Sequence, residues 1–181
     1  MSFAARLPTG GNGRGRRRAA LPRGVGVIDE RRFRDVVGAF PTGVTVVTAP
    51  GPAGLTTNAF SSVSLDPPLV LVCFDNGSRT LRAVRTARRF AVNVLRAGQE
   101  ELAAVFASKR VADEKFAAVT HTVEHGVPVL DDALAWLACE VVELVDAGDH
   151  TIGIGRVRAL EVLDGEPLLF FRGAYRSLEQ P

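Results

Sequence analysis

Residues 133–163 constrain the fold most, because they predict two long strands joined by a single tight turn. The stretch ALAWLACEVVELVDAGDHTIGIGRVRALEVL is rich in apolar and β-branched residues, and Ala147-Gly148-Asp149 near its middle is a turn signal. Two strands joined by so short a turn must run antiparallel. The segment therefore predicts an antiparallel sheet.

The other predicted elements are mostly strands. Strands are expected at 43–49, 55–65, 69–74, 89–95 and 168–173, and helices at 33–40 (capped by Asp29), 78–88 and 99–107. The continuous apolar run at 69–74 predicts a central strand covered on both faces, and 108–130 is ambiguous and partly loop. Alternating βαβ units are absent, and GNGRG at 11–15 follows no strand, so no Rossmann domain is expected. The sequence predicts a mainly β protein, an antiparallel barrel with helices at its ends.

Composition and charge fit one soluble domain behind a basic tail. The 181 residues are 46% apolar and 23% charged, with no run long enough to span a bilayer. Residues 1–24 hold six arginines and no acid, while the remaining 16 basic and 20 acidic residues give the folded part a formal charge of −4. Residues 1–26 are therefore predicted to be a disordered tail, and 27–181 the domain. A nucleic-acid-binding domain is not expected, although the tail could touch an anionic surface.

Two further features bear on the compartment. The basic N-terminus has no apolar stretch behind it, so it does not resemble a secretory signal. Cys73 and Cys139 lie in strand-like runs without a CxxC partner, which predicts buried free thiols. Both features favour the cytoplasm.

A hydroxyl-rich strand, 55–65, is the first candidate binding segment. Thr57, Ala59, Ser61 and Val63 would share one face of a continuous strand, and Asn58, Phe60 and Ser62 the other. Buried hydroxyls need partners, which a bound polar ligand would supply. An exposed edge strand, with its hydroxyls facing water, is the alternative.

Two loops could bind a phosphate. Asp75-Asn76-Gly77-Ser78-Arg79-Thr80 follows a predicted buried strand and opens a helix, where free amides and the helix dipole attract anions. Phe106-Ala107-Ser108-Lys109 ends the next helix with a hydroxyl and a cation. Ordinary helix capping by Ser78, and a favourable dipole position for Lys109, are the alternatives.

Histidines offer the remaining chemistry. His150 lies beside Asp149 between the two long strands, and it could position a substrate or act as an acid. His121 and His125 have the spacing of metal ligands on a helix, but the stretch shows no helical period and no third ligand. No metal site is predicted.

The order of motifs resembles the short-chain flavin reductases, the reductase components of two-component flavin monooxygenases. The resemblance spans roughly residues 33–176. It rests on FRDVVGAFPTGVTVVTA, LTTNAFSSVSLDPPLVLVCFDNGSRT, RFAVNVL, LAAVFASK, AGDHTIGIGRV and LLFFRGAYR. Residues 110–128 match loosely, so Phe116 is not assigned as a cofactor contact.

The resemblance implies an FMN-binding split β-barrel, usually a homodimer with flavin near the subunit interface. It implies FMN or FAD and NADH or NADPH as cofactors, with His150 at the nicotinamide. The residues that it places around the cofactors are Thr56, Thr57, Asn58, Ser61, Ser62, Val63, Asp75, Asn76, Ser78, Thr80, Phe106, Ser108, Lys109 and Tyr175. Hydride would pass to the flavin, and reduced flavin would diffuse to a monooxygenase.

Three other functions fit parts of this pattern. They are a flavin carrier without redox turnover, a split-barrel oxidase with its own organic substrate, and a nucleic-acid-binding protein driven by the arginine-rich tail.

Overall fold

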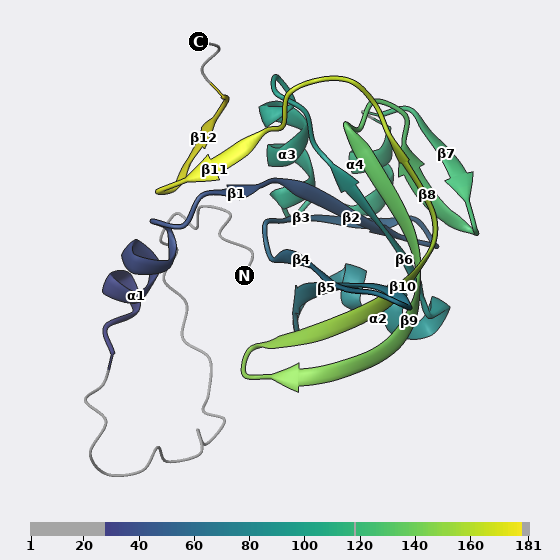
Figure 1. Cartoon of the computed structure of the whole chain (residues 1–181), viewed down its shortest axis with the longest axis horizontal. Helices are drawn as coiled ribbons and strands as arrows, with labels where there is room; N and C mark the ends of the chain where they lie inside the picture. The colour runs from purple at the N-terminus through teal and green to yellow at the C-terminus, as the bar shows by residue number, and fades with distance from the viewer. Residues whose placement is uncertain (1–27, 118, 179–181) are drawn as a thin grey trace.

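The computed structural model describes residues 28–117 and 119–178, and strands dominate this part of the chain (Figure 1). The helices are α1 (Glu30–Val37), α2 (Arg79–Ala87), α3 (Glu100–Ala107) and α4 (Ala112–Phe116). The strands are β1 (Thr42–Gly43), β2 (Thr45–Ala49), β3 (Ala53–Thr57), β4 (Phe60–Leu65), β5 (Pro68–Asp75), β6 (Arg89–Val94), β7 (His121–Glu124), β8 (Val127–Leu130), β9 (Ala135–Ala147), β10 (His150–Val162), β11 (Leu169–Phe171) and β12 (Ala174–Arg176).

Seven strands form the main sheet, in the order β3-β2-β6-β9-β10-β5-β4. Every pairing in it is antiparallel. The two outermost strands, β3 and β4, are consecutive in the chain with only Asn58 and Ala59 between them. The two margins of the sheet must therefore lie close together, so the sheet curls into an open barrel. A small sheet, β1-β11-β12, and the hairpin β7-β8 complete the described part.

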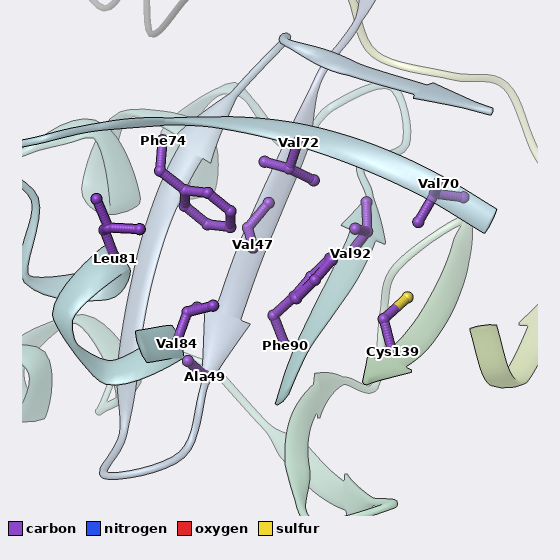
Figure 2. Packing of buried hydrophobic residues seen from close by; sticks show 10 residues of the cluster. All are labelled: Val47, Ala49, Val70, Val72, Phe74, Leu81, Val84, Phe90, Val92 and Cys139. Carbon is purple, nitrogen blue, oxygen red and sulfur yellow. The ribbon is translucent and has the colours of Figure 1, made fainter. Parts of the chain in front are cut away.

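The main core fills the inside of the curl. It holds residues of β2, β5, β6, β9 and α2, namely Val47, Ala49, Val70, Val72, Phe74, Leu81, Val84, Phe90, Val92 and Cys139 (Figure 2). The rings of Phe74 and Phe90 meet edge to face, with their centroids 5.9 Å apart. Burial raises the pKa of the Cys139 thiol to about 12, so this cysteine packs as a small apolar group.

Gly155 on β10 makes room for the aromatic pair. A Cβ at this position would lie 2.5 Å from Phe90 Cζ and 2.9 Å from Cys139 Cβ. The strand can therefore pass over the Phe90 ring only because position 155 has no side chain.

Most predicted elements are confirmed. Asp29 caps α1 by accepting a hydrogen bond from Arg32 N, and Ser78 caps α2 in the same way through Leu81 N. The long predicted hairpin is β9–β10, and its turn lies at Gly148-Asp149. The antiparallel, mainly β architecture with a few flanking helices is likewise confirmed. The arginine-rich tail lies outside the described residues.

Three expectations need correction. The segment 55–65 is not one strand, because the chain leaves β3 at Thr57 and enters β4 at the opposite margin of the sheet. Strand β5 is second from the margin, and only one of its faces packs in the core while the other stays partly exposed. Cys73, on that outer face, is accordingly only partly buried.

The ambiguous segment 108–130 forms α4 and the hairpin β7-β8. His121 lies on β7 and His125 lies in the turn after it, so the two do not have helical spacing. None of the helices in the described part is long and apolar enough to cross a bilayer.

Candidate functional site

The outer face of β4, β5 and β10 carries three predicted site residues. His150 lies opposite Asp75 in the β10–β5 ladder, and Ser61 lies opposite Leu71 in the β4–β5 ladder. Residues opposite each other share a face, as do positions two apart in one strand, so Ser61, Asp75 and His150 lie on the same face. That face is the one turned away from Val70, Val72 and Phe74 in the core.

His150 has one engaged ring nitrogen and one that is free within the described part of the chain. Its Nδ1 lies 2.8 Å from Asp149 Oδ1, and this hydrogen bond lowers the pKa of the Asp149 carboxyl. Its Nε2 is buried and has no hydrogen-bond partner among residues 28–117 and 119–178. A buried polar atom without a partner is costly, so this nitrogen is a natural point for a ligand to bind.

The β5–α2 loop is built by its own side chains. Asp75 Oδ1 accepts a hydrogen bond from Gly77 N (2.7 Å), and Ser78 Oγ accepts one from Leu81 N (3.1 Å). Thr80 is buried. The carboxylate of Asp75 and the hydroxyl of Ser78 therefore shape the loop, and the amides of Asn76 and Ser78 donate to backbone carbonyls. The amides in the first turn of α2, those of Arg79 and Thr80, are the ones suited to an anion.

The two predicted phosphate loops are neighbours in the structure. Arg79 Nη2 donates to the carbonyl of Lys109 (3.1 Å) and also to that of Arg110. Ser108 Oγ donates to Val105 O (2.6 Å), while Lys109 is exposed. Arg79 thus joins the start of α2 to the loop after α3.

Lys115 is a buried cation that the sequence did not single out. Its Nζ donates to Phe106 O (2.8 Å) and Gly54 O (3.2 Å), which ties α4 to α3 and β3. Burial, and to a smaller extent the charge of Arg79, lowers the pKa of Lys115 to about 8. The residue lies in the segment without clear periodicity. The sequence feature that could have drawn attention to it is the rarity of lysine in an arginine-rich chain.

The hydroxyl-rich segment divides into a buried and an exposed half. Thr56 and Thr57 are buried: Thr56 Oγ1 donates to Ala103 O (2.6 Å), and Thr57 Oγ1 accepts from Ala59 N (3.0 Å). Asn58 Nδ2 donates to Thr42 Oγ1 (3.1 Å).

Ser61, Ser62 and Val63 are exposed on β4. A bulge between Ser62 and Ser64 breaks the alternation, so the predicted shared face of residues 57, 59, 61 and 63 is wrong. The exposed residues on this marginal strand are the ones that a ligand could reach.

Two aromatic candidates lie elsewhere. Phe106 is 1% exposed, packs edge to face on Phe116 and covers Gly54, so its ring is part of the core. Tyr175 packs on Phe170 in the β1-β11-β12 sheet, away from the β9–β10 turn that carries His150 (Figure 1). Burial raises the pKa of the Tyr175 hydroxyl, and Glu100 raises it further. One chain alone does not bring Tyr175 to His150.

Comparison with known proteins gives consistent relatives. A protein named "Probable flavin reductase" from Rhizobium meliloti (strain 1021) is 46% identical over 154 residues, which are 82% of this chain and 49% of that protein. The reductase subunit HsaB of a flavin-dependent monooxygenase from Mycobacterium tuberculosis (strain ATCC 25618 / H37Rv) is 40% identical over 159 residues, 84% of either chain. The chain thus spans about half the length of the first relative and most of the second.

A solved structure extends the likeness to the fold. The Streptomyces globisporus C-1027 NADH:FAD oxidoreductase SgcE6, in complex with NAD and FAD fragments, superimposes with a TM-score of 0.79 at 39% identity. The superposition covers 86% of this chain and 98% of that one. The profile of the flavin reductase like domain matches residues 37–179, and the chain therefore belongs to that family.

Proposed function

We propose that this protein uses NADH or NADPH to reduce FMN or FAD and supplies the reduced flavin to a partner monooxygenase. Membership of the flavin reductase family and the names of two relatives, a monooxygenase reductase subunit and an NADH:FAD oxidoreductase, support this activity. The observation in this chain that carries the proposal is His150, whose buried Nε2 has no partner among the described residues and lies on the same sheet face as Ser61.

The residues present fit a flavin. Ser61 and Ser62 offer exposed hydroxyls on a marginal strand, and the amides at the start of α2 lie close to the cationic Lys109 loop. We assign the hydroxyls to the polar parts of the flavin and the loops to its phosphate. A bound flavin would supply a two-electron acceptor that no amino-acid side chain provides.

His150 would orient the nicotinamide. In the tautomer whose Nδ1 donates to Asp149, the free Nε2 would accept a hydrogen bond from the carboxamide N–H. The hydrogen bond to Asp149 favours this tautomer and orients the ring. The protein contributes orientation here, and no proton transfer by His150 is required.

A homodimer completes the proposal. Alternate residues of β5 and β10 on the outer face are apolar and partly exposed: Leu69, Leu71, Cys73, Ile152 and Ile154. A sheet face open to water normally carries polar residues. We therefore assign this strip, named here the outer strip, to contact with a second copy; it lies on the same face as His150.

The activity is tested by following oxidation of NADH and NADPH by the purified protein, with and without FMN or FAD. We expect oxidation that depends on added flavin, and the four pairs rank the cofactors. Flavin binding without oxidation by any pair would instead indicate a carrier, and oxygen uptake with an organic substrate but no nicotinamide would indicate an oxidase.

A further inference from the structure

Asn76 holds the turn that carries His150 from both sides. Its Nδ2 donates to Gly148 O (3.3 Å), its backbone N–H donates to Asp149 O (3.1 Å), and its Oδ1 accepts from Thr151 Oγ1 (2.7 Å). These contacts reach the two residues before His150 and the one after it. The side-chain amide of Asn76 is thus engaged within the chain, although the family resemblance suggested a cofactor contact.

Thr151 extends these contacts to α2. It is fully buried, and its Oγ1 also accepts a hydrogen bond from Arg85 Nη2 (3.1 Å). Arg85 in turn lies 3.5 Å from Asp146, which is opposite Thr151 in the β9–β10 ladder. One network, Asn76–Thr151–Arg85–Asp146, therefore connects the end of β5, both strands of the hairpin, and helix α2.

The network joins a projecting element to an anchored one. The β9–β10 turn reaches out from the body of the sheet (Figure 1). Helix α2 is fixed independently, because Leu81 and Val84 are buried in the main core. Exposed hairpin tips with few apolar contacts open easily, so polar contacts to a fixed neighbour decide how well such a tip is held.

We propose that Asn76, Thr151 and Arg85 are positioning residues, which hold the Asp149–His150 turn in register with α2 so that His150 meets the nicotinamide in one orientation. The inference rests on the proposed reductase function for its kinetic consequence. Its structural part, a turn held by the network, can be tested without any cofactor.

Thr151→Val removes the shared hydroxyl with little change of shape, and Thr151→Ser keeps the hydroxyl. Backbone hydrogen exchange at residues 147–150 of the unliganded protein should quicken about tenfold in Thr151→Val, the effect of losing a buried hydrogen bond. The apparent KM for NADH should rise about tenfold while that for flavin stays within about twofold, since α2 is anchored separately. In Thr151→Ser, both the exchange rate at residues 147–150 and the apparent KM for NADH should lie within about threefold of the wild-type values.

Thr48→Val is the matched control. Thr48 is also fully buried and donates to Pro128 O, on strands that do not carry the turn. Thr48→Val should lower the stability of the protein without changing backbone hydrogen exchange at residues 147–150 or the KM for NADH. Arg85→Met, at a half-exposed side chain, serves as the second variant should Thr151→Val fail to fold.

Unchanged exchange at the turn in Thr151→Val and Arg85→Met would overturn the proposal. So would equal effects of Thr151→Val and Thr48→Val on the KM for NADH. A wild-type protein that oxidises no NADH with any flavin would instead overturn the proposed function. The hydrogen-exchange data would still test whether the network holds the turn.

Discussion

At the scale of single residues, His150 is the most direct test of the site. His150→Ala should raise the apparent KM for NADH about tenfold and leave the KM for flavin within about twofold, because one hydrogen bond to the carboxamide is lost. Steady-state kinetics with each substrate varied in turn measure both. His125→Asn, in the exposed β7–β8 turn, is the control. An unchanged KM for NADH in His150→Ala would remove His150 from the nicotinamide site.

Gly155 offers a test of the packing. In Gly155→Ala the new methyl would meet Phe90 and Cys139, so we expect the free energy of unfolding to fall by about 1–3 kcal/mol. Urea unfolding measures the change. Gly43→Ala, where the new Cβ would have no neighbour within 4 Å, should change it by less than about 0.5 kcal/mol. Equal stability of the two variants would contradict this account of the core.

Some residues could be predicted because their signal is local. Ser78 and Asp29 cap helices through contacts within three residues, and His150 stands beside its acidic partner in the sequence. One hydrogen bond of Lys115 reaches Gly54, 61 residues away in sequence, so no local pattern could reveal it. For the same reason Phe106 could be identified as helical but not as a core residue beneath β3.

At the scale of elements, α4 is held by the buried ammonium of Lys115. In the folded chain Lys115 releases its proton near pH 8, whereas an unfolded lysine keeps it to about 10.5. The unfolded state therefore binds more protons between these values, and the stability of the wild type should rise with pH across this window relative to Lys115→Met.

Urea unfolding of the wild type and Lys115→Met, repeated from pH 7 to above pH 10, measures this difference. Lys109→Met is the control, since Lys109 is exposed. The difference in the free energy of unfolding between this variant and the wild type should not change with pH. A flat difference for Lys115→Met as well would mean that burial of Lys115 imposes no such penalty on its charge.

The break between β3 and β4 shows the limit of periodicity. Both strands carry the residue types of strands, so the existence of strands at 55–65 could be predicted. Which margin of the sheet each strand joins depends on pairing with β2 and β5, and a two-residue link between them leaves almost no signal in composition.

At the scale of the whole molecule, the outer strip predicts self-association. Leu71→Lys should raise the dimer dissociation constant at least about a hundredfold, because burying an unpaired charge costs several kcal/mol. Sedimentation velocity over a range of protein concentrations measures the constant. Val123→Lys, at an exposed position of β7, should leave it unchanged. A monomeric wild type, or a dimer insensitive to Leu71→Lys, would rule out this surface.

The pairing of β5 with β10 also determines when the domain can fold during translation. Asp75 lies opposite His150, so the first half of the main sheet has no neighbour on that side until the last third of the protein has been made. Until β10 is made, the edge of β5 that it will cover can pair only with water, and contacts so distant in sequence form slowly. We expect the domain to fold late and as one unit, after translation of β10, so that a chain truncated before His150 is a target for chaperones and proteases.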